Sequence, residues 1–120
     1  GLNGEITLLY VLEEFLRYPP YATHFTEDSL NKLRQDLKET TDEMMDKWEK
    51  VIEERGIPVT RKIKSTLGSP ANAICKIAKE ENYDLIILGN RGLGGLKKLF
   101  LGSVSLKVAN SCQTNVMIVK

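Results

Sequence analysis

The sequence predicts an α/β fold with an open parallel sheet, in a single domain over residues 1–120. Short apolar runs rich in Ile, Leu and Val are typical of strands that are buried on both faces. Amphipathic helical segments alternate with these runs along the chain, as in parallel α/β proteins. The length of 120 residues and the 42% hydrophobic content suit one core.

The first strand is expected at residues 5–12, where EITLLYVL is a nearly continuous apolar run. Residues 13–28 contain prolines and a Thr-Glu-Asp-Ser cluster, which predict a loop that ends at a helix N-cap. Thr26 and Ser29 are both suitable N-cap residues.

A long amphipathic helix with a solvated acidic face is expected at residues 27–54. It ends at Gly56, because glycine favours helix C-termini, and Pro58 prevents its restart. The apolar side of the helix is expected to consist of Leu30, Leu33, Leu37, Met44, Trp48 and Val51.

The second half of the chain continues the alternation. Residues 59–67 predict a half-exposed strand with Val59, Ile63 and Leu67 on one face. A helix follows, with Ser69 as N-cap and Pro70 at its first position. The remaining elements are a buried strand at 84–89, a glycine-rich loop, a helix at 103–111 and a strand at 115–120.

Composition excludes several classes of function. The 17 basic and 16 acidic residues leave a net charge of +1, which offers no electrostatic footprint for nucleic acid or an anionic membrane. No apolar run approaches the roughly 20 residues that span a bilayer, and the N-terminal residues do not resemble a signal peptide. We therefore expect a cytoplasmic protein.

The two cysteines and the lone histidine predict neither a metal site nor a catalytic centre. Cys75 and Cys112 lack a CxxC or metal-ligand spacing, so we expect reduced, buried packing thiols rather than a disulfide or a redox switch. His24 has no second ligand in register and is expected at the surface.

The segment that carries chemistry is the glycine-rich loop at residues 89–105. Ligands of open α/β sheets bind beyond the carboxyl ends of the strands, and Gly89 ends a predicted strand there. Gly102-Ser103 places amide N–H groups and a hydroxyl at a helix N-terminus, which favours a phosphate. Local positive charge comes from Arg91, Lys97 and Lys98.

The spacing of these glycines distinguishes among nucleotide-binding motifs. Neither GxxxxGK[ST] nor GxGxxG fits the loop. The pattern G-x2-G-x9-G-[ST] is complete at Gly89, Gly92, Gly102 and Ser103.

This pattern, in its strand-loop-helix setting, resembles the ATP-binding branch of the universal stress protein family. The likeness extends from residue 5 onward and includes segments 68–89 and 103–120. It implies a Rossmann-like, adenine nucleotide alpha hydrolase-like fold, with five parallel strands in the order 3-2-1-4-5 and ATP at the switch point. The nucleotide-binding residues that it implies are Val11, Leu88, Gly89, Arg91, Gly92, Gly102, Ser103, Val104 and Ser105.

The same resemblance implies a nucleotide-dependent regulatory or stress-response protein with an unknown protein partner. The ligand would be ATP, AMP or ADP, with Mg²⁺ or Mn²⁺ held by the phosphates, and a homodimer would form through the C-terminal strand at 116–119. Two alternatives remain, a nucleotide-independent dimeric interaction module and a slow ATPase. The loop has no Asp, Glu or His, so we expect no catalytic residue and at most weak or partner-dependent hydrolysis.

Two departures from the family pattern affect the fold. Asn115 stands where the family usually has proline, and the family's first strand, with its nucleotide-contacting aspartate, has no counterpart in the sequence. We therefore expect an N-terminally incomplete domain, in which roughly 25 to 40 upstream residues or a second chain supply one strand and one helix.

Overall fold

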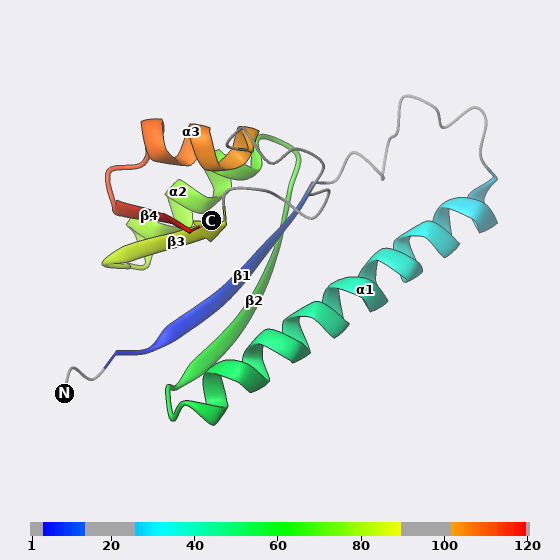
Figure 1. The fold of residues 1–120 in the computed structure, drawn as a ribbon. Coiled ribbons are helices and arrows are strands. Elements are labelled where there is room, and N and C mark those ends of the chain that lie inside the picture. Colours follow the sequence, from blue (N-terminus) through cyan, green and yellow to red (C-terminus); the bar gives the residue numbers. More distant parts are fainter. Residues whose placement is uncertain (1–3, 14–25, 90–101, 120) are drawn as a thin grey trace. The chain divides into compact units, whose positions relative to one another are not determined.

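The computed structural model of the chain describes residues 4–13, 26–89 and 102–119. Its elements, in order, are β1 (Ile6–Glu13), α1 (Glu27–Glu54), β2 (Val59–Thr66), α2 (Pro70–Glu80), β3 (Leu85–Gly89), α3 (Ser103–Ser111) and β4 (Asn115–Val119) (Figure 1). The predicted alternation of strands and helices is confirmed. The chain divides into two compact units, Gly1–Leu67 and Gly68–Lys120, which are described separately below.

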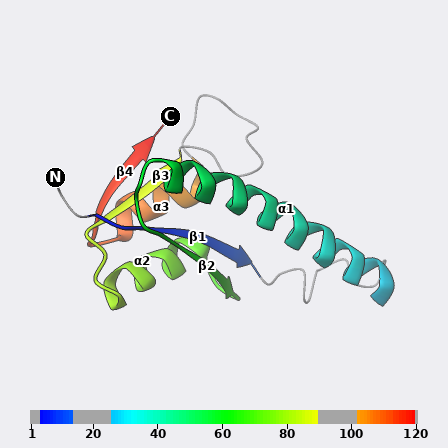
Figure 2. The same cartoon turned by 90° about the horizontal axis from the view of Figure 1, so that it is seen from below.

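The first unit consists of a parallel strand pair and one long helix. β1 and β2 pair in register from Ile6 opposite Val59 to Glu13 opposite Thr66. Helix α1 packs against both strands and runs along one side of them (Figures 1 and 2). A parallel pair cannot be closed by a hairpin, so α1 serves as the crossover between its strands.

Local signals set both ends of α1 as predicted. Thr26 is the N-cap, and its hydroxyl accepts a hydrogen bond from the Ser29 backbone N–H at 3.0 Å, which decides between the two predicted caps. Gly56 follows the C-cap with a φ of +74°, a left-handed conformation that glycine adopts without steric cost.

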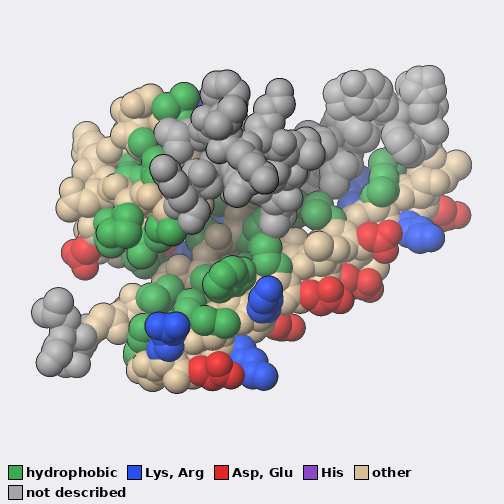
Figure 3. Space-filling view, viewed as in Figure 1, with side chains coloured by type: hydrophobic (Ala, Val, Ile, Leu, Met, Phe, Trp, Pro, Cys, Tyr) green, Lys and Arg blue, Asp and Glu red, His purple; other side chains and the backbone are tan. Residues whose placement is uncertain are grey.

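The side of α1 that is buried differs from the predicted apolar stripe. Met45 and Thr41 are buried, and the Thr41 hydroxyl donates to the Leu37 carbonyl at 2.8 Å. Trp48, by contrast, is 51% exposed, with the Lys47 ammonium 5.9 Å from its ring centroid. Acidic and basic side chains lie along α1 in Figure 3, in agreement with a solvated outer face.

Arg61 connects β2 to the C-terminal half of α1. Its guanidinium forms ion pairs with Asp46 at 2.5 Å and Glu49 at 2.6 Å, one helical turn apart. Hydrogen bonds from its guanidinium raise the pKa of Arg61 above its ordinary value, and the bond to Asp46 has a larger effect than the bond to Glu49. The planar guanidinium contacts both carboxylates at once and therefore orients α1 on the strand.

The second unit contains β3, β4 and two helices. β3 and β4 are parallel, from Leu85 opposite Asn115 to Gly89 opposite Val119. Helices α2 and α3 pack against each other, and α3 also packs on β4. As predicted, Ser69 caps α2 by accepting a hydrogen bond from the Asn72 N–H at 3.4 Å, and Pro70 is the first helical residue.

The core of the second unit is small and lies around the two helices. Its buried apolar residues are Ala71 and Ala78 of α2 and Val108 of α3. Alanine on α2 allows the neighbouring helix to approach closely.

Several apolar strand residues are more exposed than predicted. In β3, half-buried and exposed positions alternate, and Ile87 is 59% exposed, so the prediction of burial on both faces is wrong for this strand. Successive side chains point to opposite faces of a strand, so packing on a single face covers only every second residue. In the 59–67 segment Val59 is half-buried, whereas Ile63 and Leu67 are exposed.

The two parallel pairings agree with the coarse α/β prediction. The described strands form two separate pairs, β1 with β2 and β3 with β4. The complete five-stranded order stays a prediction. In the described parts of the chain, no helix is long and apolar enough to cross a membrane.

The cysteines correct another prediction. Cys75 in α2 and Cys112, the C-cap of α3, form a disulfide with a Cα–Cα distance of 5.1 Å, and both residues are half-buried. They are therefore neither reduced nor fully buried in this structure. The packing of α2 against α3 brings together residues 37 positions apart, which the local sequence around each cysteine does not reveal.

Replacing Val108 by alanine tests the small core of the second unit. Val108 is 0% exposed, so Val108→Ala removes two buried methyl groups and leaves a cavity. We expect a loss of about 2 kcal/mol in the free energy of unfolding, measured by denaturant titration of the full protein. The control is Val51→Ala, at a position 37% exposed on α1, with an expected loss below about 1 kcal/mol. Equal losses would contradict this placement of the core.

Candidate functional site

The candidate site lies in the second unit, at the carboxyl end of β3. The strand ends at Gly89, and α3 begins at Ser103, directly after Gly102. In parallel α/β proteins the carboxyl ends of strands and the N-termini of the following helices meet at one edge of the sheet. The first and last parts of the glycine motif therefore belong to the same edge.

One hydrogen bond joins these two parts directly. The Ser105 hydroxyl donates to the Gly89 carbonyl oxygen at 2.6 Å, and Ser105 is 5% exposed. This bond holds the first turn of α3 beside the last residue of β3. The predicted residues Gly89, Gly102 and Ser103 are thus brought together in the structure.

The N-terminus of α3 is suited to an anion. Gly102 is the N-cap in an extended conformation, with φ −62° and ψ 154°, and its carbonyl accepts from the Leu106 N–H at 3.0 Å. Among the described residues, no side chain caps this helix. The N–H groups of the first helical turn have no acceptor within the helix and carry the positive end of its dipole.

The side chains of this first turn differ in exposure. Ser103 is exposed and Val104 is half-buried. Ser105 is buried, and its hydroxyl donates a hydrogen bond to the Gly89 carbonyl. The Ser105 hydroxyl is therefore already engaged as a donor within the protein. The Ser105 side chain positions the helix, a role that the sequence alone did not indicate.

The remaining predicted residues lie elsewhere or outside the described residues. Leu88 is half-buried in β3, opposite Ile118. Val11 is half-buried in β1 of the first unit, opposite Lys64. The following predicted residues lie outside the described ranges: Arg91, Gly92, Lys97, Lys98 and His24.

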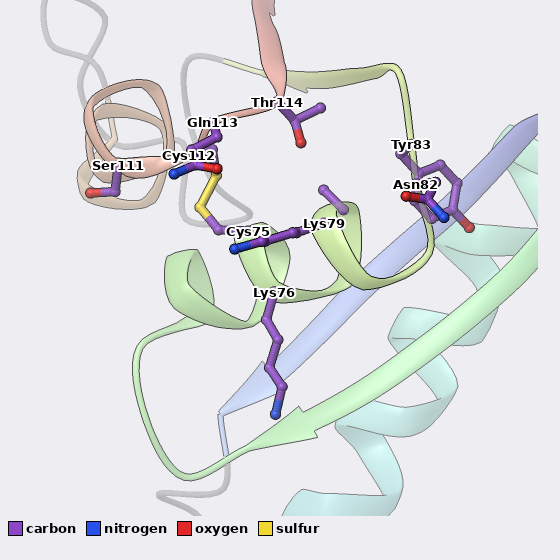
Figure 4. A pocket seen from close by; sticks show the side chains of 10 residues that line it. Cys75, Lys76, Lys79, Asn82, Tyr83, Ser111, Cys112, Gln113 and Thr114 are labelled. Atoms are coloured by element: carbon purple, nitrogen blue, oxygen red, sulfur yellow. A yellow bond between two sulfur atoms is a disulfide. The ribbon is translucent and has the colours of Figure 1, made fainter.

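A separate pocket of about 450 Å³ lies in the second unit (Figure 4). It is lined by α2, by the turn that follows α2, and by the segment around the end of α3. The Cys75–Cys112 disulfide forms part of its wall, together with Lys76 and Lys79. None of the predicted nucleotide residues is among the described residues that line this pocket, and the sequence analysis did not predict it.

Known proteins resemble this chain over its whole length. The universal stress protein family profile matches residues 1–120. Universal stress protein MJ0531 of Methanocaldococcus jannaschii is 30% identical over 118 residues, covering 98% of this chain and 66% of that protein. Universal stress protein YxiE of Bacillus subtilis is 29% identical over 121 residues, which cover 98% of this chain and 80% of that protein.

Solved structures agree with these sequence relatives. The structure of the hypothetical protein MJ0577 has a TM-score of 0.77 at 30% identity and covers 99% of this chain and 77% of its own. The crystal structure of the hypothetical protein PH0823 has a TM-score of 0.69 at 29% identity. The match covers 98% of this chain and 75% of the PH0823 chain. The fold and the sequence together show that the chain belongs to the universal stress protein family.

Proposed function

We propose that this chain binds an adenine nucleotide, ATP, ADP or AMP, at the edge formed by β3 and α3. The observation that carries the proposal is the Ser105–Gly89 hydrogen bond, which holds the end of β3 beside the start of α3. In the described residues, no side chain forms a capping hydrogen bond at that start. A phosphate there would accept hydrogen bonds from the first-turn N–H groups at the positive end of the helix. Membership of the family and the complete G-x2-G-x9-G-[ST] spacing support the same ligand.

The described residues fit a phosphate group chemically. Residues 102–105 offer backbone N–H donors and the Ser103 hydroxyl, and they include no carboxylate that would repel an anion. Gly102 has no Cβ, so a phosphate can approach the backbone closely, and the exposed Ser103 hydroxyl can donate to it. Leu88 and Val11 are assigned to ribose or adenine, and Arg91 and Gly92 to the loop around the ligand, through the family resemblance.

The proposed role of the nucleotide is regulatory. Its phosphates carry negative charge and a divalent ion, Mg²⁺ or Mn²⁺, to a helix N-terminus, and its presence would alter contacts with a protein partner. The family resemblance places the ion on the phosphates rather than on protein side chains. We assign no catalytic residue.

The assembly and location of the protein complete the proposal. We place it in the cytoplasm, as a homodimer joined through the C-terminal strand at residues 116–119. Within the described residues β4 pairs with β3 alone, so one of its edges lacks a strand partner. The proposal also includes the sheet order 3-2-1-4-5, of which the pairs β1-β2 and β3-β4 are parts.

Release of the bound ligand gives the most direct test. Freshly purified full protein is denatured by heat, and the released small molecules are identified by mass spectrometry. We expect AMP, ADP or ATP at about one molecule per chain. If no nucleotide is released and calorimetry with added ATP shows no binding, the protein is the alternative, a nucleotide-independent dimeric module. Following γ-phosphate release from ATP distinguishes a slow ATPase.

Replacing Gly102 by valine should block the proposed site without unfolding the protein. The φ of −62° at Gly102 is accessible to valine, so the harm comes from the branched side chain between the phosphate and the helix N-terminus. We expect ATP affinity by calorimetry to fall at least about tenfold, or ~1.4 kcal/mol. Gly4→Val is the matched control, because nothing lies within 4 Å of a Cβ at that residue. Unchanged affinity in folded Gly102→Val would refute the site.

Ser105 can be tested as a positioning residue. Ser105→Ala removes the bond to Gly89, so we expect the unfolding free energy to fall by about 1 kcal/mol. ATP affinity should fall by roughly three- to tenfold because the helix start moves away from the strand end. Ser105→Thr keeps the hydroxyl and should retain most of the affinity. If Ser105→Ala loses stability but binds ATP normally, the bond does not position the site.

A further inference from the structure

The Cys75–Cys112 pair takes no part in the proposed nucleotide site. We propose that it is a reversible redox site, which a hydroperoxide oxidises to a disulfide and a thiol reductant such as glutathione reduces. This inference uses the proposed cytoplasmic location but does not depend on nucleotide binding.

The backbone geometry at the two cysteines suits an intrachain disulfide. The Cα–Cα distance of 5.1 Å lies within the range of protein disulfides. Cys75 is fixed inside α2, and Cys112 is fixed by its backbone N–H, which donates to the Val108 carbonyl at 3.0 Å. Since Val108 is fully buried, this contact anchors Cys112 to the core of the unit.

The surroundings of the pair favour chemistry at sulfur. Both cysteines are half-buried and line the open pocket seen in Figure 4, so small oxidants and reductants can reach them. Lys79 lines the same pocket, whereas the Lys76 side chain points away from the disulfide in Figure 4, and no Asp or Glu is among the described residues that line the pocket. Nearby positive charge favours the thiolate, which is the reactive form of cysteine. Lys79 follows Cys75 by four residues and therefore lies on the same face of α2.

The oxidation proceeds in two balanced steps. One thiolate attacks hydrogen peroxide, the O–O bond breaks, and a sulfenic acid forms as hydroxide leaves and is protonated to water. The second thiolate attacks the sulfenic sulfur, so the S–S bond forms and the hydroxyl leaves as a second water. Overall, two thiols lose two protons and two electrons to one peroxide. Two equivalents of glutathione reverse the change through a mixed disulfide.

A reversible role suits this pair better than a permanent structural bond. Disulfides in the cytoplasm are mostly transient, catalytic or redox-sensing. A chain of 120 residues is also long enough to fold around a core without disulfide support.

The test is a redox titration of the full protein with alkylation and intact mass as readouts. After reduction, iodoacetamide should label both cysteines. Stoichiometric peroxide should abolish labelling and lower the intact mass by two hydrogen atoms. A glutathione buffer of cytoplasmic composition should restore both thiols. Cys112→Ser should instead give a sulfenic acid at Cys75 that dimedone traps, and Cys75→Ser/Cys112→Ser should show no response.

Each other outcome contradicts the proposal. Thiols that stay alkylatable after peroxide, oxidation to sulfinic acid, or a disulfide between two chains would exclude an intrachain redox pair. A bond that forms but resists the glutathione buffer would be a structural disulfide instead. These measurements contain no nucleotide, so the redox proposal can fail while the proposed ATP site is confirmed. Likewise, the ATP site can be refuted by calorimetry while the redox proposal is confirmed.

Discussion

Parallel pairing is the constraint on which the rest of the structure depends. Two parallel strands cannot be joined by a tight turn, so the chain must return to the starting edge through a crossover. In the second unit that crossover contains α3, between β3 and β4. The return brings the helix N-terminus to the carboxyl end of β3, where the Ser105 hydroxyl reaches the Gly89 carbonyl. The candidate site is thus a consequence of connectivity, and glycine and serine supply its chemistry.

Helix α3 is held at both of its ends. Ser105 attaches its first turn to β3, the disulfide attaches Cys112 to α2, and Val108 is completely buried between them. A helix of nine residues is too short to be stable alone, so its existence depends on these tertiary contacts. The same contacts keep the first-turn N–H groups at a fixed place, which is the requirement for preorganised recognition of an anion.

Local chemistry explains which features could be predicted from the sequence. Caps at Thr26 and Ser69 and the left-handed Gly56 depend on neighbouring residues only, and their predicted positions are confirmed. Exposure of Trp48 and Ile87 depends on which elements cover them, so periodicity alone gave the wrong burial. The start of α3 at Ser103 was predicted from glycine spacing, but the Ser105–Gly89 bond and the disulfide join residues 16 and 37 positions apart. Such contacts exist only once the chain has folded.

The two proposed ligands of the second unit, a nucleotide and an oxidant, act at opposite ends of the same helix. In the chain-entropy model, closing a loop of 37 residues stabilises the folded state by roughly 4 kcal/mol. A nucleotide at a hundred times its dissociation constant adds about 2.7 kcal/mol. Both effects favour the folded over the unfolded state and are of similar size, so the proposed disulfide and the proposed nucleotide would each stabilise the protein independently of the other.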